Sequence, residues 1–499
     1  MVEFLYIPNF FNYVNPKKER HSMKKKNMSL PGNPRYQPKS LRGIFGYDNL
    51  YVPVCEVELA GLRVLADIGI IPKEDYAQLT PQMVKKVRLI RTTDVDVLER
   101  SVTRHDIRAL VRKIQEVLPT ALHRWVHVPY TSYDPLETGR TLQYSRAHSA
   151  VLRPKYMKVI KILSGLVRKY SETVQIGRTH GQHALPVTVG FWLATILSRI
   201  IYNCKQIDHF ANGLSGKISG AVGASNAVHG LGIAEKCGGY SFQNRVLSDL
   251  GVNTSIISTQ ILPPEPLAYF LYSCIMLSAS LAQLGVDCRH LMRSEIAEIG
   301  EPFEEGQVGS STMAQKRNPV NFENLQGTWL KNKCEFGKVL ETLISEHQRD
   351  LVGSSVMRDF PTMLVNLTAQ LETLLREDKK KKPFLERLTV NEANCKKNLQ
   401  MSANYILAEP LYIALQMAGY TDDAHELVNR QLMPMSQQKN QSLWQSFLML
   451  VDVQPDLVKV YSNIPREVCD LLAMPENYVG DASCKALTIA DIADRYVLA

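Results

Sequence analysis

The segment from Gly309 to Pro319 has the residue types of an anion-binding loop that carries a base. It reads Gly-Ser-Ser-Thr-Met-Ala-Gln-Lys-Arg-Asn-Pro, with Ser310 near its start and Lys316 in its middle. Backbone N–H groups near Gly309 and Ser310, together with Lys316, would form an anion site. In such a field the pKa of a serine hydroxyl could be lowered, so that the serine acts as a base. On physical grounds alone, a mobile surface loop that only binds an anion explains the segment equally well.

A second glycine-rich loop, Gly177-Arg178-Thr179-His180-Gly181-Gln182, contains a histidine. Histidine can transfer protons near neutral pH. A histidine in such a loop is nevertheless more often an ordinary polar residue. Taken alone, His105 would be interpreted as a helix-face histidine, and Arg349 and Arg358 as surface arginines.

These segments together resemble the fumarase/aspartase superfamily. The Gly309–Pro319 loop is similar to its signature G-S-S-x-M-P-x-K-x-N-P, and six other segments match from residue 35 to near the C-terminus. The resemblance implies an all-α, three-domain lyase whose long central bundle forms the core of a homotetramer. It also implies active sites that are shared between subunits, and no metal or cofactor.

The resemblance assigns roles to the catalytic residues. Ser310 would be the base that removes a proton from a succinyl carbon, and His180 the acid that protonates the leaving nitrogen. Glu323 would pair with His180, and a buried carboxylate beside an imidazole raises its pKa and orients it. Lys316 and Asn318 would stabilise the doubly charged intermediate.

Further segments resemble the adenylosuccinate lyase branch of the superfamily. The resemblance implies elimination of fumarate from adenylosuccinate, giving AMP, and from the succinyl-aminoimidazole-carboxamide ribotide of purine biosynthesis. His105 would lie near the leaving nitrogen. The implied substrate-binding residues are Arg35, Tyr36, Arg104, Asp106, Thr131, Ser132, Thr179, Gln260, Arg349, Ser354 and Arg358. Arginine suits phosphate because its planar fork donates two hydrogen bonds at once.

Three departures from the branch pattern leave other functions open. Ala314 replaces a proline of the signature, Val352-Gly353 replaces Ser-His, and Pro263-Pro264-Glu265 replaces Arg-Asp-Arg. The alternatives are a divergent lyase that acts on another succinyl or aspartyl adduct, and a non-catalytic relative kept for binding. Fumarases and aspartases need no phosphate site, and argininosuccinate lyases usually carry a different loop where this chain has Thr131-Ser132-Tyr133-Asp134.

Long helices must position these loops. Apolar residues recur at helical spacing over 159–170 and 192–204, and the segments 266–298 and 321–346 are nearly free of helix breakers, which favours a bundle. The loops 171–190, 213–230 and 300–319 carry the glycines. We predict a disordered appendage at 1–27, an N-terminal helical domain at 28–130, the bundle at 131–382 and a C-terminal helical domain at 383–499. The uncharged stretch Leu267–Val286 is long enough to cross a bilayer, but a buried bundle helix explains it better.

Composition indicates a globular cytoplasmic protein. The chain has 499 residues, 45% of them hydrophobic and 21% charged, and nine scattered cysteines without zinc spacing. The formal net charge is +9, of which residues 1–27 supply +4. This mild basic excess suits a small anionic substrate better than a nucleic acid. We therefore expect a nucleotide-sized anionic ligand and no nucleic-acid or membrane partner.

Overall fold

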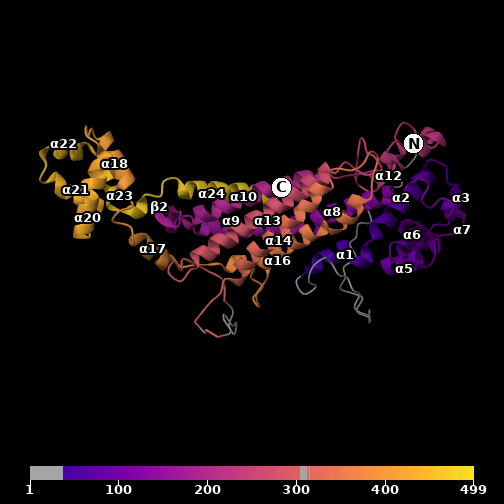
Figure 1. Ribbon diagram of the computed structural model, residues 1–499, viewed down its shortest axis with the longest axis horizontal. Helices are drawn as coiled ribbons and strands as arrows, with labels where there is room; N and C mark the ends of the chain where they lie inside the picture. Colours follow the sequence, from indigo (N-terminus) through magenta and orange to yellow (C-terminus); the bar gives the residue numbers. More distant parts are fainter. Residues whose placement is uncertain (1–36, 304–311, 314, 499) are drawn as a thin grey trace.

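A computed structural model describes residues 37–303, 312, 313 and 315–498. The predictions for residues 1–27, Arg35, Tyr36, Ser310 and Ala314 lie outside these ranges. Figure 1 shows an elongated molecule, with long helices along its middle, a group of short helices at one end and a second small helical group at the other. The described residues are mostly helical, as the sequence predicts, and they also form three small sheets of two strands each.

The helices fall into three sets along the chain. The first set is α1 (Arg42–Phe45), α2 (Val52–Asp67), α3 (Lys73–Tyr76), α4 (Pro81–Val87), α5 (Thr92–Leu98), α6 (Asp106–Gln115), α7 (Thr120–His123) and α8 (Tyr133–Ala147). The second is α9 (Arg153–Lys169), α10 (Val189–Asn212), α11 (Asn226–Gly230), α12 (Phe242–Asp249), α13 (Glu265–Leu291), α14 (Val320–Glu341), α15 (Val352–Val356) and α16 (Pro361–Leu375). The third is α17 (Glu392–Gln400), α18 (Ala408–Met417), α19 (Ala424–Glu426), α20 (Met433–Lys439), α21 (Leu443–Val451), α22 (Pro455–Asn463), α23 (Arg466–Ala473) and α24 (Ala482–Leu498).

The central bundle is built around α13, which packs against α10, α14 and α16. Its apolar residues extend around the helix, and Phe270, Leu277 and Leu284 have no exposed surface. Gly285 allows α14 to approach closely, because a Cβ at this position would lie 2.6 Å from the carbonyl oxygen of Phe322. Of the described helices, only α13 is long and apolar enough to cross a membrane, and most of its apolar window is buried. It is a buried helix of the bundle, as the sequence predicts.

Hydrophobic clusters group the chain differently from the predicted domain ranges. One cluster joins the first helices to residues 218–252, and another lies within 407–472. The last helix, α24, returns to the bundle (Figure 1) and buries Ala486, Ala490 and Ala493 against it. These small residues lie on one face of α24, which lets the helix lie close to α9 and α10.

The segment 171–190, predicted as a loop, contains a β-hairpin. β1 (Val174–Thr179) pairs antiparallel with β2 (Gln182–Thr188), and the register shifts between Ile176 and Arg178. Gly177 occupies this irregularity, where a Cβ would lie 2.8 Å from the carbonyl oxygen of Leu185. The glycines that suggested a loop therefore permit a bulged hairpin. The two other sheets pair β3 (Ser215–Gly216) with β4 (Asn253–Thr254) and β5 (Ile299–Gly300) with β6 (Thr389–Val390).

Candidate active site

Nine of the predicted site residues line one cavity of about 990 Å³. The cavity lies among α2, α6, α8 and the segment that contains α15. The nine residues are Arg104, His105, Asp106, Thr131, Ser132, Gln260, Arg349, Ser354 and Arg358. They come from four stretches of the chain that are far apart in sequence. The fold thus brings together in one pocket several motifs that lie far apart in the sequence.

Arg349 is the centre of a polar network in this pocket. Its guanidinium donates to Gln260 Oε1 and, over 3.0 Å, to Ser354 Oγ. It also stacks on Tyr133, with 3.2 Å between the guanidinium carbon and the ring centre. The Tyr133 hydroxyl bonds Ser354 in turn. These contacts hold the arginine in place before any ligand binds, which reduces the loss of conformational entropy on binding.

Three arginines of the pocket have no carboxylate partner among the described residues. Arg104, Arg349 and Arg358 form no ion pair there, although Asp96, Glu99 and Asp106 also line the cavity. A guanidinium without a counter-charge favours an anionic ligand. Tyr51 stays neutral beside them, because burial, and then the charges of Asp106 and Glu99, raise the pKa of its phenol.

His105 lies immediately before α6 and not within it. Its Nδ1 accepts a hydrogen bond from the backbone N–H of Arg108 over 3.4 Å, so the imidazole caps the helix. Arg104 has a φ of 53°, in the left-handed region. His105 is therefore not the helix-face histidine that its local sequence suggests, because the chain turns at Arg104 and brings His105 to the start of α6.

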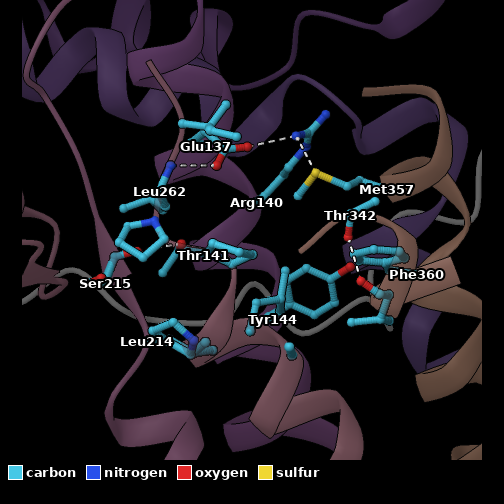
Figure 2. A pocket seen from close by; sticks show the side chains of 17 residues that line it. Glu137, Arg140, Thr141, Tyr144, Leu214, Ser215, Leu262, Thr342, Met357 and Phe360 are labelled. Carbon is cyan, nitrogen blue, oxygen red and sulfur yellow. Dashed lines mark hydrogen bonds and ion pairs between the residues drawn. The ribbon is translucent and has the colours of Figure 1, made fainter. Parts of the chain in front are cut away.

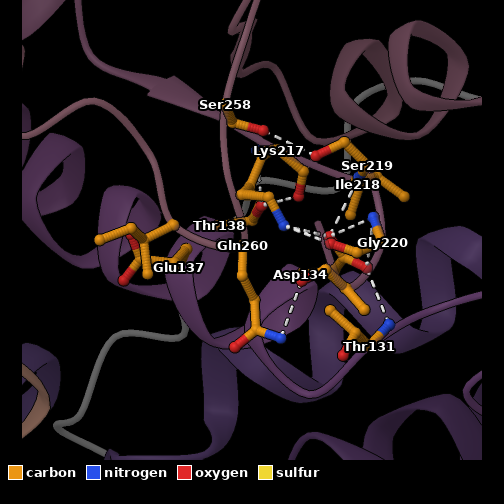
Figure 3. Close-up of polar contacts among 12 residues, drawn as sticks. Thr131, Asp134, Glu137, Thr138, Lys217, Ile218, Ser219, Gly220, Ser258 and Gln260 are labelled. Carbon is orange, nitrogen blue, oxygen red and sulfur yellow. Dashed lines mark hydrogen bonds and ion pairs between the residues drawn. The ribbon is translucent and has the colours of Figure 1, made fainter. Parts of the chain in front are cut away.

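The Thr131–Ser132 loop is fixed by a buried ion pair (Figure 3). Lys217 Nζ donates to Asp134 Oδ1 over 2.6 Å, and neither side chain has more than 1% of its surface exposed. The same carboxylate accepts backbone N–H bonds from Thr131 at 2.8 Å and Ser219 at 3.0 Å. Asp134 thus joins the loop to the segment that follows β3. In the segment Thr131-Ser132-Tyr133-Asp134, the aspartate therefore holds the loop in place.

Replacing Lys217 by methionine should destabilise the protein by about 3–5 kcal/mol, because the Asp134 charge would stay buried without a partner. Urea unfolding of the variant measures this loss. Lys158→Met removes a pair with Glu377 in which both side chains are about half exposed, and it should cost at most about 1 kcal/mol. Equal losses in the two variants would contradict the importance of burial.

A smaller cavity of about 60 Å³ adjoins the pocket (Figure 2). The two share Arg140, Tyr144 and Met357, and the smaller one is also lined by Pro263 and Pro264. Glu137 stands at its edge and accepts hydrogen bonds from Arg140 at 2.7 Å and from the Leu262 N–H at 3.3 Å. The proline pair that departs from the branch pattern therefore shapes the surroundings of the main pocket.

Thr179 and His180 lie elsewhere, at the tip of the β1–β2 hairpin. Both are exposed, and His180 and Gly181 have φ values of 55° and 78°. Two consecutive residues with positive φ are typical of the tight turn that joins two strands. In Figure 1, β2 lies toward the end of the bundle that carries α17, whereas α6 and α8 lie toward the other end.

Lys316, Asn318 and Glu323 also lie away from the pocket. Lys316 and Glu323 are exposed, Asn318 is half-buried, and Glu323 belongs to the first turn of α14. α14 has 22 residues and is therefore about 33 Å long. Its other end reaches the cavities, where Val339 lines the smaller one. No bond joins Glu323 to His180 within the described chain, so a single subunit does not assemble the full predicted set.

Tyr133 and Arg140 are pocket residues that sequence reasoning missed. Tyr133 lies between Ser132 and Asp134, and no role was assigned to it. Arg140 lies seven residues further on, and its guanidinium is 5.8 Å from the Tyr133 ring centre. The Tyr133 hydroxyl bonds Ser354, 221 residues away. Helical spacing from Tyr133 could have placed Arg140 on the same face of α8, but no local signal indicates the long-range contact.

Comparison with known proteins identifies the relatives of the chain. A family model described as "Lyase" matches residues 45–331. The adenylosuccinate lyase of Pyrococcus horikoshii is 32% identical over 90% of this chain and 94% of its own length, and that of Streptococcus mutans is 30% identical over 89% and 96%.

Solved structures show the same fold. A fumarate lyase from Mesorhizobium sp. BNC1 superposes with a TM-score of 0.75 at 21% identity, covering 91% of this chain and 98% of that one. A 3-carboxy-cis,cis-muconate lactonizing enzyme from Pseudomonas putida also gives 0.75, at 23% identity and with 93% and 98% covered. The motifs, the helical bundle and the full-length similarity agree, and the chain belongs to the adenylosuccinate lyase family of the fumarase/aspartase superfamily, as a carbon–nitrogen lyase.

Proposed function

We propose that this lyase cleaves adenylosuccinate to AMP and fumarate, and also cleaves the succinyl-aminoimidazole-carboxamide ribotide, as a cytoplasmic enzyme of purine biosynthesis. The observation that carries the proposal is the pocket with three arginines that form no ion pair with the described residues. Both substrates carry a phosphate and a succinyl group. Arginines outside an ion pair can bind these anionic groups.

The pocket residues divide between the two ends of such a substrate. Arg349, Ser354 and Arg358, with Arg35 and Tyr36, would bind the phosphate and ribose. Thr131, Ser132 and Gln260 would bind the succinyl group, together with Thr179 from the hairpin of another subunit. Arg104, His105 and Asp106 would lie beside the leaving nitrogen. The hydrogen bond from Arg349 to Gln260 links the first two sets, so the position of one end of the substrate influences the other.

The chemistry would be a β-elimination carried out by side chains and backbone amides alone. Ser310 takes a proton from the succinyl carbon next to a carboxylate. Lys316 and Asn318 stabilise the charge that develops there. His180, oriented by Glu323, gives a proton to the nitrogen as the carbon–nitrogen bond breaks, and fumarate leaves. Proton transfer and charge stabilisation suffice for these reaction steps, so we expect no cofactor.

The site would be completed by other subunits of a homotetramer. The pocket and the His180 hairpin lie toward opposite ends of the bundle, and about 24 Å of α14 separates Glu323 from Val339 at the smaller cavity. The central helices also expose large apolar side chains, among them Tyr202, Tyr272 and Leu340. Apolar residues on neighbouring long helices favour association of subunits.

Light scattering at micromolar concentration should therefore give the mass of a tetramer, four times 56.3 kDa. Replacing Tyr272 by glutamate should shift the protein toward smaller species, because it places a charge on the apolar face. A monomeric mass for the wild type would contradict the shared site.

The purified protein should release fumarate from adenylosuccinate, and added chelators should not change the rate. The increase in fumarate absorbance measures the reaction, and the imidazole-carboxamide adduct is assayed in parallel. Turnover of argininosuccinate or aspartate, with neither purine adduct cleaved, would instead favour the divergent-lyase alternative. Pro263 and Pro264, which line the smaller cavity beside the pocket, support that alternative, because they stand where the branch pattern has charged residues.

A further inference from the structure

Arg178, the residue two positions before His180, forms a buried bidentate ion pair with Glu298. The two guanidinium–carboxylate distances are 3.0 Å and 2.7 Å, and the exposed fractions of the side chains are 8% and 0%. Arg178 also donates to the Ile176 carbonyl of its own strand over 3.2 Å. A bidentate pair in this environment fixes direction as well as distance. The end of β1 next to the turn is thus attached to Glu298 in one orientation.

Glu298 is itself held on all sides. Asn398 of α17 donates to Glu298 Oε1 over 2.8 Å, the Glu298 backbone N–H donates to Leu291 at the end of α13, and its carbonyl accepts from Asn391. Asn398 therefore holds the carboxylate, two backbone hydrogen bonds hold the residue that carries it, and the carboxylate in turn fixes the hairpin through Arg178. The pair cannot rotate without breaking bonds to the bundle and to α17.

The segment after Glu298 leads into the signature loop, and a second glutamate closes the base of that loop. Glu301 accepts the Phe322 N–H at 2.9 Å and Asn321 Nδ2 at 2.7 Å. Burial raises the pKa of Glu301. Residues 298–301 thus contact the hairpin at one end and the loop base at the other. This short segment is a common support for both elements.

The structure of the hairpin makes its position sensitive to this support. Thr179 and Gln182 pair across the turn, so the direction of the strands at Arg178 sets the place of His180. On β2, the only described side-chain contact of His183 is a 2.8 Å hydrogen bond to Ser402. The exposed tip itself has no hydrogen bond from its His180 side chain to the rest of the described chain.

We infer that Arg178 and Glu298 are positioning residues that place His180 for proton transfer. The inference rests on the proposed role of His180 as the acid. A displacement of about 1 Å can lower a rate by about a hundredfold. The alternative is that the pair only stabilises the fold, in which case its loss would have the same effect on the rate whether or not His180 is present.

A double-mutant cycle separates these two possibilities. The double variant Arg178→Met/Glu298→Gln removes both charges and leaves an acceptor for Asn398, so no unpaired charge remains buried. We expect kcat to fall about tenfold to a hundredfold and KM to change by less than about threefold, because the nine predicted site residues that line the pocket are untouched and Thr179 is the one proposed substrate contact on the hairpin. In a His180→Gln background, the same double change should lower kcat by less than about twofold.

Arg146→Met/Glu56→Gln is the matched control. It removes another bidentate Arg–Glu pair, between α8 and α2, whose residues line neither cavity. Its kcat should stay within about twofold of the wild type. If the Arg178/Glu298 double variant does not fold, Arg178→Lys keeps the buried charge but loses the fork, and it should still lower kcat severalfold without raising KM.

An equal fall in kcat in both backgrounds, or no fall in the wild-type background, would overturn the inference. Failure of the proposed function has a different signature, namely a wild type that cleaves neither purine adduct. The cycle is then measured with the succinyl or aspartyl adduct that the enzyme does cleave, because the support of the hairpin concerns the elimination and not the nucleotide.

Discussion

Replacing His180 by glutamine, or Ser310 by alanine, should lower kcat by about 10²–10⁴ while the fold stays intact, because each variant loses a proton-transfer group. His180 lies at an exposed turn, so its replacement should leave thermal unfolding almost unchanged. Steady-state release of fumarate measures kcat. His425→Gln, the same exchange at an exposed position of α19, should retain full activity.

Mixing the two inactive variants tests whether a site contains residues of more than one chain. If it does, some sites in mixed tetramers carry neither lesion, and part of the activity should return after subunit exchange. A mixture that stays inactive after mass spectrometry has confirmed the exchange would mean that one chain supplies both residues. The proposal that each active site is shared between subunits is the reason to expect recovery.

The long helices could be predicted from sequence because their signals are local. Val54, Val57 and Leu65 recur at helical spacing, and the structure places them in α2. The uncharged run after Pro266 lies in α13. The β1–β2 hairpin could not be predicted in this way, because its glycines indicate a loop when only neighbours in sequence are considered. Its strands depend on Gly177 fitting closely against Leu185 and on Arg178 reaching Glu298, 120 residues away.

The pocket shows the same division between local and long-range information. Motifs named Arg349, Ser354 and Gln260, but the network that joins them requires segments 89 residues apart to meet. Tyr133 and Arg140 are ordinary helix residues in sequence, and only packing places them against Arg349 and Met357. Patterns in one chain also cannot indicate which residues meet across subunits, and this applies above all to His180 and Glu323.

Replacing Arg358 by alanine should raise KM by about tenfold to a hundredfold, with a smaller effect on kcat. A charge-assisted hydrogen bond contributes about 1.5–3 kcal/mol, and Arg358 would contact a part of the substrate that does not react. Arg358 is the sharper choice than Arg349, because Arg349 also supports Gln260 and Ser354, and its loss would disturb the pocket itself. Arg358 lines the pocket and forms no hydrogen bond or ion pair of its own with the rest of the described chain.

Inhibition by AMP and by adenosine isolates the phosphate from the rest of the nucleotide. The wild type should bind AMP much more tightly than adenosine, and Arg358→Ala should lose most of that preference because the contact that distinguishes the two ligands is gone. Arg430→Ala, which breaks an exposed pair with Glu426 in the C-terminal helices, should leave the preference unchanged. Equal inhibition of the wild type by both ligands would mean that this pocket does not bind a phosphate. The three arginines would then bind another anion, such as a second carboxylate of a different succinyl adduct.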